Sequence, residues 1–295
     1  MCILKPYIDQ RHIFMNVLQV FHHQQLVLGA DGREIRALPP NKNGRAIVAK
    51  TLHPEYNPLI LKLESIFTLT DDERKALQNL PMQVVVIKEG QDIVRAGDSP
   101  SRSCLLLSGF ACVYKLTGDG KRQIVGFSIA GDIPDLQSLH LDVLDNSLST
   151  LTPCRVGFIT HEALRNLCER YPRITSAFWR ETLIDAAIFR EWVINVGQRE
   201  AYGRMAHVFC ELIVRLRAVG LVEDHACHLP ITQAEFADAI GVSTVHVNRV
   251  LQEMRAHGII ELSGDRLKVP DWETLKRAGD FDPTYLHLKR EQAAA

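Results

Sequence analysis

The sequence predicts an α+β protein in which an antiparallel β-domain precedes a long helix and a C-terminal helix-turn-helix with a β-hairpin. Three patterns indicate this fold class. Short apolar runs alternate with glycines over 82–160, large apolar residues recur at helical spacing over 174–197, and two capped helices meet at Gly241. A chain of 295 residues is also too long for one ordinary core, so we expect more than one domain.

The first boundaries are read from a linker-like run and from helix-start signals. Residues 1–57 are an extension of unassigned role, for which we consider partial disorder, because 38–44 reads Leu-Pro-Pro-Asn-Lys-Asn-Gly. Order is expected from Pro58, and a Thr70…Glu73 capping box begins a helix. The expected divisions are 1–57 for the extension, 58–172 for the β-domain, 173–197 for the long helix, 198–283 for the C-terminal domain and 284–295 for a flexible tail.

The β-domain is predicted from repeated strand–turn units. Apolar or β-branched runs are separated by glycine-containing turns, with Gly118-Asp119-Gly120 as a hairpin tip. Units of this spacing are typical of an antiparallel sandwich or barrel. The runs are 84–87, 104–107, 111–114, 123–125 and 156–159.

Helix returns after the strands. Thr160 is a suitable N-cap for a helix to about Arg170, and a longer helical stretch follows over 174–197. The longer stretch has two interpretations that its pattern does not separate: it pairs with a second copy of the chain, or it packs on the β-domain. For the first interpretation, the dimerisation residues are Phe178, Leu183, Ala186, Phe189, Val193 and Val196.

The segment 232–254 reads as two helices joined by a tight turn. Thr232…Glu235 forms a capping box, Gly241 ends the first helix, and Ser243 caps the second. The small Ala237 allows the helices to approach closely. The inward residues are Phe236, Ala237 and Ile240 on the first helix and Val247, Val250 and Leu251 on the second. These steric requirements are those of a helix-turn-helix.

The second helix leaves polar residues on its outer face. Asn248 and Arg249 can form bidentate contacts with purine edges, Val245 can contact a thymine methyl, and Ser243 can donate to a phosphate. Two short strands around Ser263-Gly264-Asp265 form a hairpin where a wing would lie. We therefore predict binding to double-stranded DNA through Thr232, Gln233, Ser243, Thr244, Val245, His246, Asn248, Arg249 and Gln252.

With these residues in place, the chain resembles the Crp/Fnr family of bacterial transcription regulators over about 58–283. The resemblance rests on Gly90, Gly97-Asp98, Gly109 and Gly131-Asp132 and on the segment 231–260. It implies an N-terminal β-roll (double-stranded β-helix) sensor domain, a dimerisation helix and a C-terminal winged helix-turn-helix. It further implies a homodimer on a two-fold symmetric DNA site, with RNA polymerase as a partner if the protein is an activator.

The resemblance also assigns the main base-reading positions to Thr244, Val245 and Arg249. Arg249 matches the family reader, whereas many relatives carry Arg or Glu where this chain has Thr244 and Val245. We therefore expect a changed specificity at those two positions.

The effector of the β-domain is left unknown, and we expect that it is not a cyclic nucleotide. Relatives that bind one carry a Gly-Glu pair and an arginine, but here 132–154 contains no Lys or Arg and four aspartates. Carboxylates without a cation disfavour a buried phosphate. Iron–sulfur binding fits poorly because only Cys2 lies near the N-terminus, and haem would depend on a lone His140 or Cys112. No cofactor is assigned.

The composition bounds the remaining function classes. The net charge of −1 excludes a chain-wide basic field, so DNA binding must be local. Seven scattered cysteines without a C-x-x-C pair favour reduced thiols in the cytoplasm, and no apolar run is long enough for a membrane span or an export signal.

Catalytic and metal-binding alternatives are weaker. No nucleophile elbow, phosphate-binding glycine loop or motif-bound carboxylate pair occurs, so we expect no enzyme activity. His225, Cys227 and His228 are close in sequence, but we favour a solvated loop over a metal site and assign no metal. The alternative function is a signalling module that binds a small molecule, metal or haem and has little DNA binding of its own.

Overall fold

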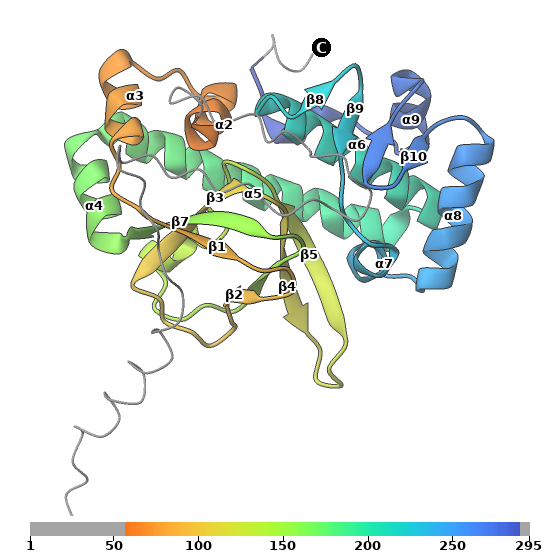
Figure 1. Cartoon of the computed structure of the whole chain (residues 1–295), viewed down its shortest axis with the longest axis horizontal. Coiled ribbons are helices and arrows are strands. Elements are labelled where there is room, and N and C mark those ends of the chain that lie inside the picture. The colour runs from red at the N-terminus through yellow and green to blue at the C-terminus, as the bar shows by residue number, and fades with distance from the viewer. Residues whose placement is uncertain (1–56, 290–295) are drawn as a thin grey trace, which may run out of the picture. The chain divides into compact units, whose positions relative to one another are not determined.

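The computed structural model describes residues 57–289, which begin with two short helices, α2 (Pro58–Ile66) and α3 (Asp71–Gln78) (Figure 1). The Asn57 side chain accepts a hydrogen bond from the Leu59 amide at 3.0 Å and caps α2. The predicted capping box is confirmed, since Thr70 accepts from the Glu73 amide and Glu73 accepts from the Thr70 amide. Both caps satisfy amides that a helix start leaves unpaired.

Seven strands then form two antiparallel sheets with the orders β1-β7-β3 and β2-β6-β4-β5. The predicted antiparallel β-domain is therefore confirmed. Two strands, β2 and β6, were not expected from the sequence, because they are short and β6 reads Ser-Leu-Ser-Thr. The bounds are β1 (Gln83–Ile87), β2 (Asp92–Val94), β3 (Arg102–Ser108), β4 (Ala111–Leu116), β5 (Arg122–Ser128), β6 (Ser147–Thr150) and β7 (Cys154–Thr160).

Two turn glycines are required by close approaches of the backbone. Gly109 has φ 98°, and an added Cβ would lie 2.8 Å from the Pro153 carbonyl oxygen. Gly131 has φ 96°, and its Cβ would lie 2.5 Å from the carbonyl oxygen of Pro58 at the start of α2. Any side chain at Gly131 would therefore push α2 away from the β-domain.

Apolar side chains of both sheets fill the interior of the β-domain. Each member of the cluster is at most 7% exposed, and two of them are cysteines. Its members include Cys104, Leu106, Ala111, Val113, Leu148, Cys154 and Val156, with the Cys112 thiol buried as well.

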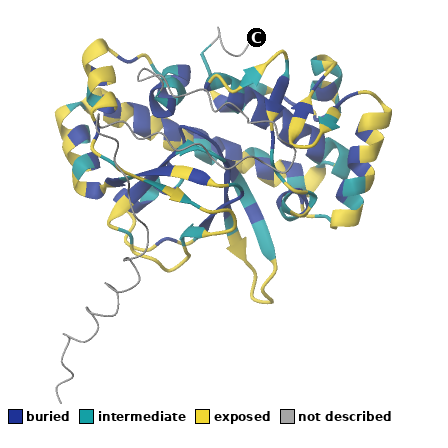
Figure 2. Cartoon of the chain, in the orientation of Figure 1, coloured by how far each residue is buried: buried dark blue, intermediate teal, exposed yellow. Residues whose placement is uncertain are grey.

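Helices follow the roll. A 3-10 turn, η1 (Leu136–Leu139), lies between β5 and β6. After β7, α4 (His161–Arg170) begins at the predicted cap Thr160, whose hydroxyl accepts from the Ala163 amide. The long α5 (Pro172–Gln198) buries one face against its own chain and exposes the other (Figure 2). Phe178 lies on the buried face with 6% exposure, so its predicted place in a dimer contact is wrong: it packs with Leu59 and Ile174 instead.

The C-terminal domain begins with α6 (Ala201–Ala218), which the sequence analysis did not identify. It continues through β8 (Val222–Glu223), β9 (Ala226–His228), α7 (Gln233–Ile240), α8 (Thr244–Ala256), β10 (Glu261–Ser263), β11 (Arg266–Lys268) and α9 (Trp272–Ala278). The predicted wing hairpin is confirmed as β10–β11, but it belongs to a four-stranded sheet of order β10-β11-β9-β8. Residues 225–228 therefore lie at the turn and second strand of a hairpin rather than in the expected loop.

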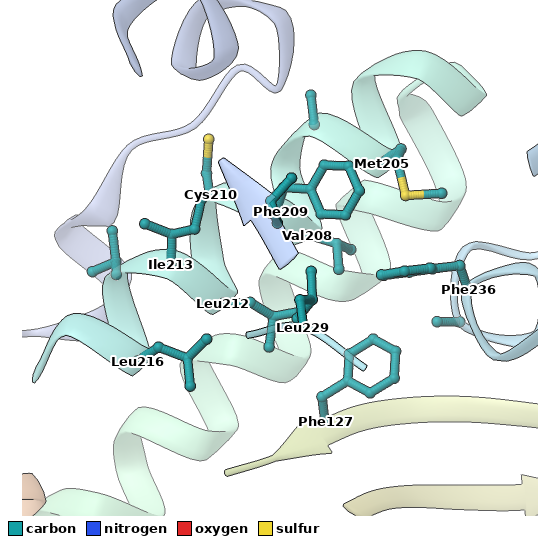
Figure 3. Packing of buried hydrophobic residues seen from close by; sticks show 14 of the residues in the cluster. Phe127, Met205, Val208, Phe209, Cys210, Leu212, Ile213, Leu216, Leu229 and Phe236 are labelled. Atoms are coloured by element: carbon teal, nitrogen blue, oxygen red, sulfur yellow. The ribbon is translucent and has the colours of Figure 1, made fainter. Parts of the chain in front are cut away.

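The helix α6 is the centre of the largest apolar core, where side chains of the roll and of the helix-turn-helix meet (Figure 3). Phe236 of α7 lies edge-on to Phe209 of α6, with ring centroids 5.4 Å apart. Phe127 of β5 contacts the same Phe236 at 6.0 Å and Trp192 of α5 at 5.8 Å. This aromatic contact joins the β-roll to the C-terminal domain.

The chain end is more ordered than the sequence indicated. A 3-10 turn, η2 (Pro283–Leu286), follows α9, Leu286 is 2% exposed, and the Lys289 amide donates to the Ser65 carbonyl at 2.8 Å. The predicted flexible tail from 284 is therefore wrong for 284–289, because Leu286 has a place in the core. Residues 290–295, and the extension predicted over 1–57 apart from Asn57, lie outside the described residues. No helix within 57–289 is long and apolar enough to cross a membrane.

Candidate nucleic-acid interface

The first helix of the motif, α7, starts and stops where its local sequence requires. Thr232 Oγ1 accepts from the Glu235 amide at 3.2 Å, and Glu235 Oε2 accepts from the Thr232 amide at 2.7 Å. Gly241 then adopts φ 71°, and its amide donates to the Ala237 carbonyl at 3.0 Å. This left-handed residue ends the helix and turns the chain into α8.

The second helix, α8, is fixed by a cap and by a buried face. Ser243 Oγ accepts from the His246 amide at 3.3 Å, as predicted for an N-cap. Ala237 of α7 is 6% exposed, and its small side chain permits the close approach of the two helices. The residues that α8 buries are Val247, Val250, Leu251 and Met254, each at most 3% exposed.

The opposite face of α8 is open to solvent. Val245 is 81% exposed, which leaves most of a β-branched side chain in water in the isolated chain. Ser243, Thr244, Arg249 and Gln252 are exposed beside it. Five of the predicted DNA-binding residues thus share one exposed surface at the start of α8 and along its first turns.

The remaining predicted residues are partly engaged within the chain. Asn248 Nδ2 donates to Gln233 Oε1 at 3.1 Å, so these two half-buried side chains brace α8 against α7. Arg249 donates to His246 Nε2 at 3.3 Å, which orients the guanidinium at the exposed face. Thr232 is exposed, and its hydroxyl serves the capping box.

The wing adds cations that sequence reasoning missed. Arg266 and Lys268 of β11 are exposed, whereas Leu267 between them is fully buried. Lys268 Nζ lies 3.4 Å from the Glu261 carboxylate across the hairpin, and Arg266 forms no ion pair with another described residue. The Arg-Leu-Lys alternation was the available signal, since alternate side chains of a strand face opposite ways.

The His225–His228 segment does not form a metal site. Arg217 Nη2 donates to His225 Nδ1 at 2.9 Å, and the His225 ring stacks on Trp272 at 6.0 Å. Cys227 points into the core, where burial raises the pKa of its thiol to about 11. His228 instead lies 3.7 Å from Asp265 on the exposed side. Throughout 57–289, no group of three or more His, Cys, Asp or Glu side chains is arranged to hold a metal ion.

Two aspartates of the cation-free stretch are buried and engaged by the chain itself. Asp135 Oδ1 accepts from the Cys104 amide at 2.8 Å, and burial raises the pKa of Asp135 to about 6. Asp132 Oδ2 accepts from the Ile129 amide at 2.8 Å and pairs with Arg215 of α6 at 2.9 Å. Asp132 therefore connects the roll with the C-terminal domain.

The outer face of α5 carries large apolar side chains. Leu183 is 57% exposed, Phe189 45% and Val193 69%, while Ala186 and Val196 are half-buried. The sequence analysis omitted two further members of this face, Trp179 (68%) and Ile194 (47%). We call Trp179, Leu183, Ala186, Phe189, Val193 and Ile194 the α5 stripe.

Comparison with known proteins agrees with both halves of this architecture. The family described as "Crp-like helix-turn-helix domain" matches residues 203–278, and the family "Cyclic nucleotide-binding domain" matches 84–171. Together they cover more than half of the chain. The chain belongs to the Crp/Fnr family of transcription regulators.

Relatives within the Crp/Fnr family are moderately similar. The transcriptional activator protein FnrL of Cereibacter sphaeroides is 26% identical over 199 residues, which cover 65% of this chain and 78% of that protein. The fumarate and nitrate reduction regulatory protein of Salmonella typhi is 23% identical, covering 71% and 83%. The structure of FixK2 from Bradyrhizobium japonicum superposes with a TM-score of 0.62 at 19% identity, over 68% of this chain and 98% of that one.

These matches confirm the expected family and fold class. The Crp/Fnr relatives are named as transcription regulators rather than as enzymes, in agreement with the expectation from the sequence. The helix-turn-helix of this Crp/Fnr chain lies at α7–α8, within the matched segment 203–278.

Proposed function

We propose that the protein binds double-stranded DNA as a homodimer, with α8 of each copy in the major groove of one half-site. The observation that carries this proposal is that α8 has one buried face and one exposed face. One face is at most 3% exposed at four core residues, and the other presents Val245 at 81% exposure beside Thr244 and Arg249. A helix held this rigidly presents its outer side chains at defined positions, as base reading requires.

Three side chains of α8 are proposed to read bases. Arg249 suits a guanine, because its guanidinium can donate to O6 and N7 together. Val245 suits a thymine methyl, and Thr244 can donate or accept. The exposed Arg266 of the wing is proposed to contact phosphate, together with the free amides at the start of α8.

Dimer formation is proposed through the α5 stripe. Apart from the small, half-buried Ala186, its side chains are large, apolar and exposed along one face of a 27-residue helix. Contiguous exposed apolar surface is typical of an interface, and parallel packing of two α5 helices would cover it. A two-fold dimer would place two copies of α8 about one DNA turn apart, which strengthens binding through effective concentration.

The effector is proposed to be something other than a cyclic nucleotide. The stretch 132–154 has no cation, and its Asp132 is already paired with Arg215 and Lys62. A protein of this function acts on chromosomal DNA in the cytoplasm, and RNA polymerase is its expected partner if it activates transcription.

Selection of binding sites from random double-stranded DNA by the full-length chain tests the proposal. We expect an inverted repeat whose half-site centres lie about one helical turn apart, ~10 base pairs. The matched control replaces Thr244, Val245 and Arg249 by Ala and should select no common motif. A motif without two-fold symmetry would contradict the dimer, and an unchanged motif from the triple variant would contradict the assigned readers.

A further inference from the structure

A buried cluster of charges joins α2, the β-roll, α5 and α6 at a place remote from the outer face of α8. Arg215 of α6 is its centre: Nη2 lies 2.9 Å from Asp132 Oδ2, and Nη1 lies 3.2 Å from Glu211 Oε1. Lys62 of α2 pairs with Asp132 from the other side and also with Glu181 of α5. One set of ion pairs therefore links elements far apart in the sequence.

Further hydrogen bonds extend the cluster through the C-terminal domain. Glu211 Oε2 accepts from Trp192 Nε1 of α5 at 3.0 Å and from the Tyr285 hydroxyl of η2 at 2.9 Å. Arg215 Nη2 also donates to the Phe127 carbonyl of β5 at 3.0 Å. The position of α6 on the roll thus depends on this polar contact as well as on the apolar core.

The cluster holds more acids than bases. Its cations are Lys62 and Arg215, and its carboxyl groups are Asp132, Glu181, Asp185 and Glu211. Glu181 is 8% exposed, and within 57–289 no hydrogen-bond donor is aligned with either of its oxygens. Asp185, one helical turn further along α5, forms neither an ion pair nor a hydrogen bond with any described residue.

The two cations and Asp132 keep their charges. Burial disfavours the charged form of Asp132, but Lys62 and Arg215 lower the pKa of its carboxyl below the ordinary value. Burial likewise acts against the charge of Arg215, yet Asp132 and Glu211 raise the pKa of its guanidinium. The excess negative charge therefore concentrates at the Glu181–Asp185 end of the cluster.

A small cavity of about 40 Å³ is lined by Lys62, Asp132, Glu181, Asp185 and Arg215, together with apolar side chains of α2, α5, α6 and the chain end. A space of this size accepts about one water molecule and excludes an organic effector. No described side chains are arranged there as a metal site. A proton is the one cation that relieves the charge excess without needing room.

We propose that Glu181 and Asp185 form a proton-dependent latch that holds α6, and with it the helix-turn-helix, against the β-roll. When Asp185 carries a proton, Glu181 faces a neutral group and shares Lys62 with Asp132. When that proton is lost to solvent, two carboxylates one turn apart on α5 repel each other beside Asp132. The contact of α6 with the roll is then weaker.

Asp185 is expected to change its protonation state near neutral pH. Burial, and next the Glu181 carboxylate, raise the pKa of Asp185 to about 7, whereas Lys62 and Arg215 act in the opposite direction. Asp185 is half-buried, so solvent can exchange its proton. Since an undocked Asp185 would titrate nearer its ordinary value of 3.8, the docked state binds the proton more tightly. Docking is therefore favoured below pH 7 and weakened as the pH rises through 7.

Release of the latch would also displace the DNA-binding face of α8. The helix α6 packs against α7 through Phe209 and Phe236, and Arg204 Nη1 donates to the Ile240 carbonyl at the end of α7 at 2.9 Å. A shift of α6 therefore moves α7 and α8 with it. This inference concerns regulation and holds whatever DNA site α8 reads.

Hydrogen–deuterium exchange of the full-length protein without DNA tests the latch. Exchange is measured at pH 6 and pH 8 in peptides spanning 127–135 and 205–216, with labelling times scaled for intrinsic exchange. In the wild type we expect protection of the α6–roll contact to fall about tenfold from pH 6 to pH 8. Asp185→Asn cannot lose a proton and should show no such fall. Asp142→Asn removes an exposed carboxyl and serves as the matched control.

A second variant keeps the test decisive if Asp185→Asn folds poorly. Glu181→Gln removes the carboxylate that raises the pKa of Asp185, so its pH response should be smaller and shifted to lower pH. Rescue of the wild-type response by Asp185→Glu would support the latch. Equal pH responses in the wild type and in Asp185→Asn, or a full response in Glu181→Gln, would overturn it.

Discussion

Arg122 of β5 and Asp238 of α7 form an ion pair, with Nε 2.7 Å from Oδ2, that ties a hairpin of the β-roll to the first helix of the helix-turn-helix. The adjacent Gln123 Nε2 donates to the Ala239 carbonyl of α7 at 3.1 Å. A movement of the β4–β5 hairpin is therefore transmitted to α7 through these two polar contacts and through the neighbouring Phe127–Phe236 contact.

The strength of this pair is predicted from its exposure. The Arg122 and Asp238 side chains are 34% and 32% exposed, so water screens them in part. A double-mutant cycle with Arg122→Ala and Asp238→Ala should give a coupling free energy of about 0.2–1 kcal/mol. Urea unfolding measures it. The more exposed Lys115–Asp145 pair is the control and should couple less. Additive single effects at Arg122 and Asp238 would show that the pair adds nothing.

Arg249→Ala tests base reading. Loss of its bidentate donors should weaken the free energy of binding to a selected DNA site by about 1–3 kcal/mol. It should also relax the base preference at one position per half-site. Fluorescence anisotropy on the selected site and on random DNA measures both effects. Arg266→Ala, on the wing, should weaken binding to the selected site and to random DNA equally. Equal losses on both DNAs for Arg249→Ala would make Arg249 a phosphate contact only.

The β-roll is predicted not to bind cyclic AMP. The stretch 132–154 contains no Lys or Arg, so it offers no cationic partner for a buried phosphate. Calorimetry with millimolar nucleotide should show no saturable heat, and DNA affinity should be unchanged. A micromolar dissociation constant would disprove this.

Charges introduced into the α5 stripe should separate the dimer. Replacing Leu183 and Val193 together by Asp puts two carboxylates on each side of an apolar contact, while both side chains are exposed in the single chain. Sedimentation should then show folded monomers that have lost specific DNA binding. Leu116→Asp, on an exposed hairpin, is the control and should stay dimeric. A wild type that is monomeric at micromolar concentration yet binds a symmetric site tightly would refute dimerisation through α5.

Gly241→Ala should destabilise the C-terminal domain. The residue has φ 71°, and the nearest atom to an added Cβ is Arg204 Nη1 at 3.8 Å, so the cost is backbone strain rather than a clash. We expect a loss of about 1 kcal/mol in the free energy of unfolding. Gly118→Ala, at a turn with open space and no left-handed φ, should change it by less than about 0.5 kcal/mol. Equal effects would show that the turn conformation is not what Gly241 supplies.

The helix-turn-helix could be predicted in detail because its signals are local. Thr232 with Glu235, Ser243 with His246 and Gly241 with Ala237 each interact within four residues, so spacing alone identifies them. The helix α6 escaped prediction for the opposite reason. Every residue over 205–214 is buried, His207 and Glu211 included, so this part of α6 has no solvent-exposed face to mark it as a surface helix. The strands β2 and β6 are short, and they pair with each other across more than fifty residues of sequence, so no local pattern marks them.

The sequence by itself determined the capped motif and the outer face of α8, since these depend on neighbours along the chain. It left the two faces of α5 unassigned, because Phe178 and Leu183 fit the same apolar period. Only tertiary packing decided that Phe178 faces Leu59 while Leu183 faces outward. The buried charge cluster was likewise invisible, because Lys62 and Arg215 meet Asp132 from 70 and 83 residues away. No local rule of spacing brings such groups together; the folding of α2 and α6 onto the roll does.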